Sequence, residues 1–370
     1  SAIVVSIITM ENYIISQLLR LISIPSVTGQ ESDVLFYLEE EIERIGLDYE
    51  RQRVEGSFYN ILVGNYQTPK WIICSHVDTV SPLDMMPPRA EVRDDRIYGL
   101  GACDVKSGIA VMLALLKEFY ESIYEKGVLF AFLVDEEKDG RGSKELSHSL
   151  SNVEGIKGAI VIEPTDMKIA VREAGSIEVV CFVDGKWAHG SCVEVGDNAI
   201  MKAIKLISEF DELPFMKDED PLVGPSTYNI LYFVGGSEEL RVPSRAKFLV
   251  DFRIIPRRDV NEVVDSIVGL FRKYGTTYEF RDISSGFIVD ENEEVVQLLK
   301  KAYKDILGVD PSFTGMKSWT DAENLYTVEV PSIVFGPGKL EDAHTPWENV
   351  SIKDLFDFYR ILRRFLEILP

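Results

Sequence analysis

The sequence of 370 residues is long enough for about two to three domains around a large core, which excludes a peptide hormone or a small disulfide-stabilised protein. Asp and Glu number 61 against 39 Lys and Arg, so the formal net charge is −22 at pH 7. A surface this acidic repels phosphate backbones and anionic lipids, and we expect neither nucleic acid nor membrane as a partner. The 46% hydrophobic and 10% aromatic content is typical of a packed globular protein.

Residues 1–10 are apolar, but they lack a basic stretch and a cleavage site and are fewer than the about 20 apolar residues that span a bilayer. We expect either a natural start at Met10, with a foreign segment before it, or a short N-terminal strand. No other segment resembles a targeting or membrane-spanning sequence, so we expect a cytoplasmic protein. The cysteines form no C-x-x-C pair, which predicts buried free thiols.

The first half of the sequence predicts helices that alternate with buried strands. Apolar residues recur at helical spacing between residues 11 and 46, and the breaker-rich turn 24–29 divides them into two helices. Short runs rich in Val, Ile and Phe predict buried strands at 71–75, 128–134 and 159–162, with a helix over 104–120. The alternation predicts an α/β domain with a mostly parallel sheet covered by helices.

After about residue 174 the pattern changes. The next elements follow the order strand, helix, strand, strand, helix, strand, at 177–183, 198–210, 228–234, 247–255, 260–274 and 277–281. This order predicts a ferredoxin-like α+β unit that folds by itself. Helix and strand patterns return at 293–306, 332–335 and 352–369. We therefore expect one α/β domain of residues 1–174 and 284–370, interrupted by an inserted α+β domain of residues 175–283.

Side chains that bind metals follow the first three predicted strands. His76 and Asp78 follow the first strand, Glu136 and Glu137 the second, and Glu163 the third. Ligands of open α/β sheets bind beyond the carboxyl ends of the strands, so these side chains should converge.

Two further candidates are Asp104, at the start of a predicted helix, and His344, in a loop after a late strand. Taken alone, an aspartate in the position of Asp104 is more often a helix N-cap. The run 135–137 alone would usually be a solvated turn, and His76 alone would usually be a hydrogen-bonded histidine of the core. Taken together, these histidines and carboxylates would be costly in one cleft without cations, which favours a divalent metal pair. Imidazole and carboxylate without thiolate suit Zn²⁺, Co²⁺ or Mn²⁺, and such a pair activates water for hydrolysis.

Several motifs resemble the metal-site motifs of the zinc aminoacylase and carboxypeptidase family, which includes acetylornithine deacetylase, succinyl-diaminopimelate desuccinylase and glutamate carboxypeptidase. The motifs are His76-Val77-Asp78, Gly101-Ala102-Cys103-Asp104-Val105-Lys106-Ser107-Gly108, Asp135-Glu136-Glu137, Glu163-Pro164-Thr165 and Ala343-His344-Thr345-Pro346. They occur in the family's order along essentially the whole chain, so the resemblance is far more specific than any one of them.

The resemblance implies a set of metal ligands within a catalytic domain. His76, Asp104 and Glu163 would bind one side of the metal pair. His344 and Glu137 would complete the second metal, with Asp104 bridging both ions. Zn²⁺ is the metal that the family implies.

The resemblance also implies residues that act without binding metal. Glu136 would be the general base and acid, and Asp78 would orient a ligand imidazole. The inserted domain resembles the family's lid and dimerisation domain, where His189 would polarise the scissile carbonyl of a substrate. Asn229 and Arg253 match positions that bind a substrate carboxylate. The alternatives are a surface-loop histidine and an arginine that only braces the sheet.

The resemblance implies a dinuclear amidohydrolase that removes an acyl group from an N-acyl amino acid such as acetylornithine, acetyl-lysine or succinyl-diaminopimelate, and a homodimer formed through the inserted domain. The alternative is a metallopeptidase of the same family, a carboxypeptidase or dipeptidase acting on short peptides. A non-catalytic metal-binding protein is a remote third hypothesis, because no ligand or base is missing. Lys317 and Trp319 depart from the family's small-residue stretch and leave the acyl preference open, and His148 predicts a helix-surface residue without function.

Overall fold

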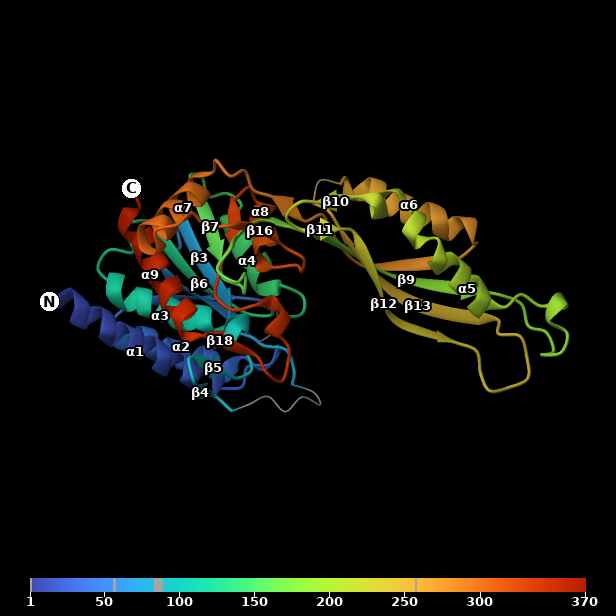
Figure 1. The fold of residues 1–370 in the computed structure, drawn as a ribbon, viewed down its shortest axis with the longest axis horizontal. Helices are drawn as coiled ribbons and strands as arrows, with labels where there is room; N and C mark the ends of the chain where they lie inside the picture. Colours follow the sequence, from blue (N-terminus) through green and yellow to red (C-terminus); the bar gives the residue numbers. More distant parts are fainter. Residues whose placement is uncertain (1, 56–57, 83–88, 257) are drawn as a thin grey trace. The chain divides into compact units, whose positions relative to one another are not determined.

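The computed structural model describes residues 2–55, 58–82, 89–256 and 258–370. Its internal contacts divide the chain into two compact units (Figure 1). Unit 1 comprises Ser1–Val171, Val289–Thr314 and Thr320–Pro370, and unit 2 comprises Arg172–Ile288 and Gly315–Trp319. Each unit has its own sheet and is described by itself.

The central sheet of unit 1 has the strand order β1-β2-β6-β3-β7-β17-β8. The bounds are β1 Tyr49–Arg53, β2 Tyr59–Gly64, β3 Trp71–His76, β6 Val128–Leu133, β7 Gly158–Val161, β8 Ile169–Glu173 and β17 Ser332–Val334. The inner strands β6, β3, β7 and β17 run parallel, whereas β1 and β2 form an antiparallel hairpin at one edge. Every residue of β3 and β6 is buried, as expected for strands covered on both faces, and the predicted strands are confirmed.

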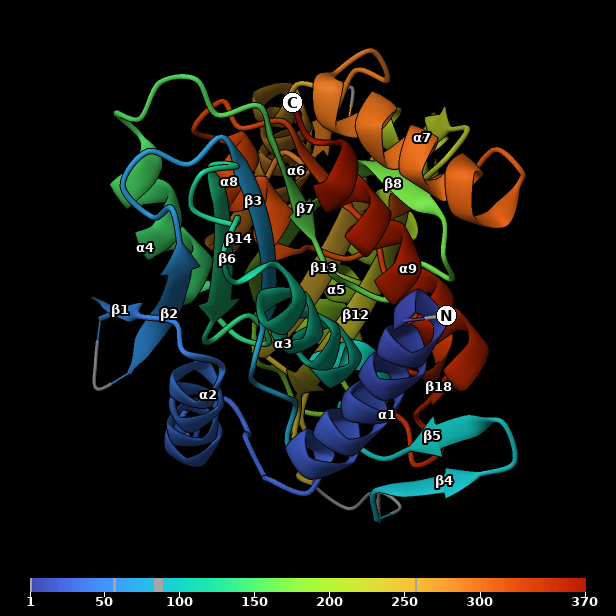
Figure 2. The same ribbon diagram turned by 90° about the vertical axis from the view of Figure 1, so that its left-hand side faces the viewer.

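Helices cover both faces of this sheet. Their bounds are α1 Ala2–Ile22, α2 Ser32–Ile45, α3 Ser107–Phe119, α4 Arg141–Leu150, α7 Glu294–Leu307, α8 Asp321–Tyr326 and α9 Ile352–Ile368. Helices α3, α7 and α9 lie on one face and α4 and α8 on the other (Figure 1, Figure 2). The expected strand near the N-terminus is wrong, because α1 begins at Ala2. None of the helices in the described chain is both long and apolar enough to cross a membrane.

A small antiparallel sheet of order β18-β5-β4 accompanies the central sheet. Its strands are β4 Glu91–Arg93, β5 Arg96–Tyr98 and β18 Asn349–Ser351. Sequence reasoning missed these strands because three residues are too few to show a period. The remaining short strands are β10 Glu219–Asp220, β11 Gly224–Pro225, β15 Phe287–Ile288 and β16 Phe313–Met316.

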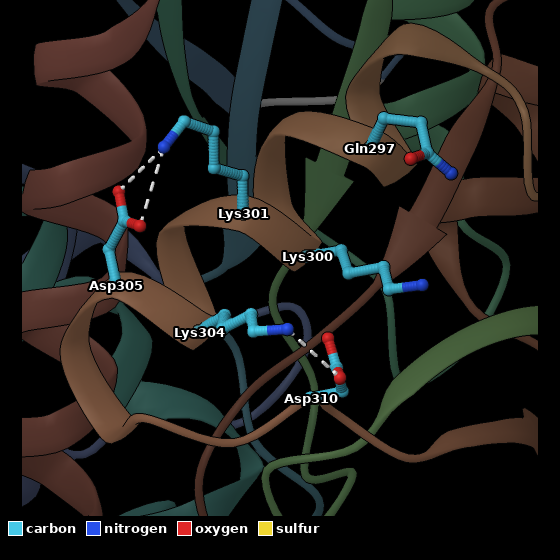
Figure 3. A pocket seen from close by; sticks show the side chains of 6 residues that line it. All are labelled: Gln297, Lys300, Lys301, Lys304, Asp305 and Asp310. Atoms are coloured by element: carbon cyan, nitrogen blue, oxygen red, sulfur yellow. Dashed lines mark hydrogen bonds and ion pairs between the residues drawn. The ribbon is translucent and has the colours of Figure 1, made fainter.

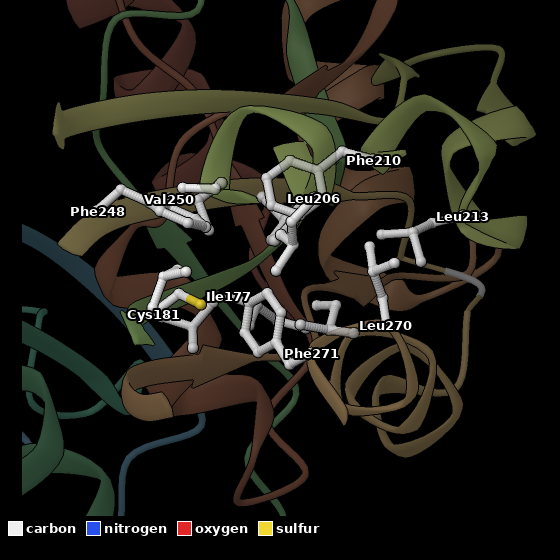
Figure 4. Close-up of a cluster of buried hydrophobic side chains, with 14 of the residues drawn as sticks. Ile177, Cys181, Leu206, Phe210, Leu213, Phe248, Val250, Leu270 and Phe271 are labelled. Atoms are coloured by element: carbon white, nitrogen blue, oxygen red, sulfur yellow. The ribbon is translucent and has the colours of Figure 1, made fainter. Parts of the chain in front are cut away.

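Unit 2 contains a four-stranded antiparallel sheet of order β12-β13-β9-β14 and two helices. Along the chain the elements are β9 Gly175–Asp184, α5 Ala199–Ser208, β12 Thr227–Gly235, β13 Arg245–Ile254, α6 Val260–Lys273 and β14 Thr277–Ser284. This is the predicted ferredoxin-like order. Figure 4 shows the core between sheet and helices, which includes Cys181, Leu206, Phe248 and Phe271. Unit 2 therefore buries a hydrophobic core of its own.

The cysteines differ in burial. Cys74, Cys103 and Cys181 are buried free thiols, as predicted, but Cys192 is exposed. The expectation of buried thiols is wrong for Cys192 because it lies in an exposed loop of unit 2 rather than in a strand.

Candidate metal centre

His76 is the last residue of β3 and presents one ring nitrogen to a group of carboxylates. Its Nδ1 lies 2.9 Å from the backbone oxygen of Asp78 and 3.4 Å from Asp78 Oδ1. Both neighbours are acceptors, so Nδ1 carries a proton and Nε2 is the ring atom that faces the carboxylates. The hydrogen-bond partner of Nδ1 is thus the backbone oxygen of Asp78, and the carboxylate of the same residue lies slightly farther away.

Asp104 lies in the turn Ala102–Lys106, where its φ of −123° and ψ of 82° are not helical. The expected helix start at this residue is wrong, because α3 begins at Ser107 and Asp104 does not cap it. Asp104 Oδ1 lies 3.1 Å from His76 Nε2, and Oδ2 lies 3.1 Å from His344 Nε2. The two oxygens of one carboxylate therefore face two different imidazoles.

Glutamates that follow β6 and β7 complete the group. Glu163 Oε1 lies 3.4 Å and Glu136 Oε2 lies 3.8 Å from His76 Nε2. Glu137 Oε1 lies 2.9 Å from the Nε2 atom of His344. The residues predicted at the strand ends of unit 1 thus converge, as the parallel arrangement of β3, β6 and β7 requires.

The donor atoms fit divalent cations. In two sets of three, His76 with Glu136 and Glu163, and His76 with Asp104 and Glu137, the potential ligand atoms lie within 4.8 Å of one another. Glu163 Oε1 is buried and has no hydrogen-bond partner among the residues that the structure describes. Within the described ranges, no Lys or Arg forms an ion pair with these carboxylates, so His76 and His344 alone offset their charge.

The protonation of the metal-free centre reflects this excess of negative charge. Burial raises the pKa of Glu163 to about 8 and the pKa of Glu136 well above its usual value. Hydrogen bonds to Asp104 and Glu137 raise the pKa of His344 to about 10. Burial opposes ionisation of Asp104, but hydrogen bonds from His344 and His76 outweigh it and lower its pKa. The centre therefore retains protons that bound cations would displace.

Asp78 also fixes the loop after β6. Its Oδ1 accepts the backbone N–H of Glu136 at 3.1 Å, and its Oδ2 accepts that of Glu137 at 3.1 Å and the hydroxyl of Thr28 at 2.7 Å. One carboxylate consequently holds both the His76 ring and the two glutamates. The sequence motif indicated the first of these contacts but not the second.

A bidentate ion pair between Asp135 and Arg141 also stabilises the loop after β6. Asp135 is 2% exposed, and its carboxylate accepts Arg141 Nε at 2.8 Å and Arg141 Nη2 at 2.7 Å. The backbone N–H of Gly140 donates to the Asp135 carbonyl at 2.7 Å. Sequence reasoning gave Asp135 no role, although an arginine six residues after an acidic run was the available signal.

We expect Asp135→Asn to lower kcat by roughly 10- to 100-fold, because the loop that carries Glu136 loses its charged anchor. The free energy of unfolding should fall by about 2 kcal/mol, because the partly exposed Arg141 loses the buried carboxylate to which it donates two hydrogen bonds. Steady-state kinetics and urea unfolding measure the two effects. Asp139→Asn, an exposed change in the same loop, is the control, and an unchanged kcat in Asp135→Asn would contradict the anchoring role.

The residues predicted in the inserted domain lie in unit 2. His189 is exposed, and its Nδ1 accepts the backbone N–H of Ser191 at 3.2 Å, so Nε2 carries the proton of a neutral ring. Asn229 is exposed on β12 opposite Asp251 of β13. Arg253 donates to Asp251 Oδ2 at 2.9 Å, so its guanidinium already has one carboxylate partner.

A hollow on α7 contains none of the predicted site residues. It has a volume of about 280 Å³ and is lined by Gln297, Lys300, Lys301, Lys304, Asp305 and Asp310 (Figure 3). Two of the lysines pair with its aspartates, Lys301 with Asp305 at 3.1 Å and Lys304 with Asp310 at 3.3 Å. The two aspartates therefore offset two of the three lysines that line the hollow. His148 is exposed on α4, as predicted.

Comparison with known proteins identifies the family that shares this arrangement. Residues 72–368 match the pattern of peptidase family M20/M25/M40. The chain belongs to this family. As an M20 protein it is a metal-dependent hydrolase that acts on linear amide or peptide bonds.

Relatives of the M20 chain carry different names. A peptidase M20 domain-containing protein of Schizosaccharomyces pombe is 31% identical over 91% of this chain and 80% of its own. The succinyl-diaminopimelate desuccinylase of Corynebacterium glutamicum is 26% identical over 94% of each chain. The crystal structure of a Staphylococcus aureus tripeptidase has a TM-score of 0.80 and 26% identity, and the match covers 97% of this chain and 98% of that one.

Proposed function

We propose that this M20 enzyme removes an acyl group from an N-acyl amino acid at a pair of divalent metal ions, with Zn²⁺ as the metal. The observation that carries the proposal is the position of Asp104, whose two oxygens each lie 3.1 Å from a different histidine. A carboxylate in that position is suited to bridge two cations. The buried Glu163 Oε1, which lies 3.4 Å from His76 Nε2 and forms no hydrogen bond with the described residues, supports the same conclusion.

The metal ligands divide into two sets. His76, Asp104 and Glu163 would hold one ion, and Asp104, Glu137 and His344 would hold the other. The second set is supported by His344 Nε2, which lies 2.9 Å from Glu137 and 3.1 Å from Asp104. Bound metal ions supply a lowered water pKa and a polarised scissile carbonyl.

Glu136 carries the proton transfers in this proposal. Its Oε2 lies 3.8 Å from His76 Nε2 and among the potential ligand atoms of the cluster, but the two proposed ligand sets do not include it. Its carboxylate accepts a proton from the attacking water and then donates that proton to the leaving nitrogen as the C–N bond breaks. The products are a carboxylate and a free amine.

Unit 2 would contribute to substrate recognition. The His189 Nε2–H would donate to the scissile carbonyl oxygen, and Asn229 and Arg253 would bind the substrate carboxylate. The exposure of the His189 ring, whose Nδ1 already accepts the Ser191 N–H, supports the first role. We further propose that the enzyme forms a homodimer through unit 2 and works in the cytoplasm, where buried free thiols such as Cys74 and Cys103 remain reduced.

The names of the relatives favour acyl amino acids as substrates and leave peptides as the second candidate. Succinyl-diaminopimelate desuccinylases match almost the whole chain at 25% to 26% identity, which favours a succinylated or acetylated diamino acid. Metallopeptidase activity is the second candidate, because a tripeptidase structure shares 26% identity and the fold.

A parallel assay of succinyl-diaminopimelate, acetylornithine, acetyl-lysine, a dipeptide and a tripeptide tests the substrate class. We expect kcat/KM for at least one acyl amino acid to exceed that for the peptides by about 100-fold or more, since a site built for one polar group rejects analogues that lack it. Turnover of peptides alone would refute the deacylase proposal and establish the peptidase.

A further inference from the structure

Glu348 is a buried carboxylate that touches the turn of Asp104, and no motif in the sequence gave it a role. It lies four residues after His344, next to β18, and is 1% exposed. Its Oε1 accepts the backbone N–H of Asp104 at 3.0 Å and that of Cys103 at 3.2 Å. Its Oε2 has no hydrogen-bond partner in the described part of the chain.

The backbone of the Asp104 turn explains why this acceptor is needed. Asp104 and Val105 have φ values of −123° and −144°, outside the helical range, so the turn cannot satisfy its N–H groups as a helix would. A buried N–H without an acceptor is costly. Glu348 Oε1 accepts two adjacent N–H groups and so fixes the direction of the peptide that leads into the Asp104 side chain.

The backbone around Glu348 is itself held by hydrogen bonds to strand β5 and the residue that follows it. Its carbonyl oxygen accepts the backbone N–H of Gly99 at 3.1 Å, and the next residue, Asn349, pairs with Tyr98 in the β18–β5 ladder. Three residues separate strand β5 from the turn that carries Asp104. The carboxylate is therefore fixed relative to the turn by backbone hydrogen bonds that do not involve the metal ligands.

We propose that Glu348 is a positioning residue that holds Asp104 so that Oδ1 faces His76 and Oδ2 faces His344. This inference rests on the proposed function, in which Asp104 bridges both metal ions. It predicts that loss of Glu348 weakens both metal sites together. A carboxylate that only ordered the loop of His344 would weaken one site and leave the other intact.

Zn²⁺ titration against a chromophoric chelator of known affinity tests this role in the full-length protein. We expect Glu348→Ala to lower Zn²⁺ affinity at both sites by about 10- to 100-fold, the range for residues that hold metal ligands in place. Glu348→Gln keeps an acceptor oxygen at the same distance from the backbone, so its affinity should stay within about fivefold of the wild type. Glu341→Ala, which removes an exposed glutamate from the same loop, should change nothing.

Each outcome of the titration either supports or overturns the positioning role of Glu348. Weakening of one site alone, or unchanged affinity in folded Glu348→Ala, overturns the proposal. If Glu348→Ala does not fold, Glu348→Gln decides: a loss below fivefold supports the acceptor role, and a larger loss overturns it. Wild-type protein that binds fewer than two Zn²⁺ ions refutes the proposed metal pair instead, so the two failures are distinguishable.

Discussion

Glu136→Gln is expected to lower kcat by about 10³-fold while both metal ions stay bound. The amide keeps the size of the side chain but cannot accept the proton of the attacking water. The residue belongs to neither ligand set in the proposed centre, so its replacement should not release metal. KM should change little, because the substituted group acts in the transition state.

Steady-state kinetics and metal analysis of the same preparations measure both halves of this expectation. Asp139→Asn is the matched control, an exposed acidic residue of the same loop that should retain wild-type kcat. Full activity in Glu136→Gln would show that Glu136 takes no part in the proton transfers. Loss of one metal equivalent would instead make Glu136 a ligand, which its position 3.8 Å from His76 Nε2 would then explain.

Removal of the metal ions is expected to make stability depend strongly on pH. Burial raises the pKa of Glu163 from 4.5 to about 8, so the folded protein binds a proton that the unfolded chain releases. The neutral carboxyl is tolerated at low pH, and stability is lost as pH rises from about 4.5 through 8. The raised pKa of His76 acts in the same direction, because its contribution is present below 6.5 and is lost as pH rises.

Thermal and urea unfolding at several pH values, with and without a chelator, measure this dependence. Between pH 6 and 9 the metal-free protein should lose about 2–3 kcal/mol of unfolding free energy from Glu163 alone. The metal-bound protein should lose much less, since cations compensate the ionised carboxylates. Glu163→Gln should flatten the plot of unfolding free energy against pH for the metal-free protein. Glu341→Gln should leave that plot unchanged. Parallel profiles with and without chelator would contradict the proposed metal centre.

The sequence predicted the parts of the centre that depend on regular structure. The apolar runs that end at His76, Glu136 and Glu163 are buried on both faces, and parallel strands bring their carboxyl ends to one edge of the sheet. The ferredoxin-like order of unit 2 was predictable for the same reason, because strand and helix periods alternate clearly in that segment.

Residues whose role depends on irregular backbone could not be predicted in this way. Asp104 was placed at a helix start because the apolar residues that follow it recur at helical spacing, but the turn Ala102–Lys106 leaves the helical range before α3 begins. The partners of Asp135 and Glu348 are backbone N–H groups or an arginine across a loop. Such contacts follow from tertiary structure and leave no periodic signal in the sequence.

The histidines and carboxylates of the candidate metal centre all belong to unit 1, whereas His189, Asn229, Arg253, Lys317 and Trp319 belong to unit 2. Unit 2 has a hydrophobic core of its own. In the proposed function, substitutions of Asn229 and Arg253 would alter substrate recognition without disturbing the metal ligands or Glu136, which all belong to unit 1. This separation would allow one fold to serve proteins named for desuccinylation and for tripeptide cleavage, and it makes Asn229 and Arg253 the positions to vary for a new selectivity.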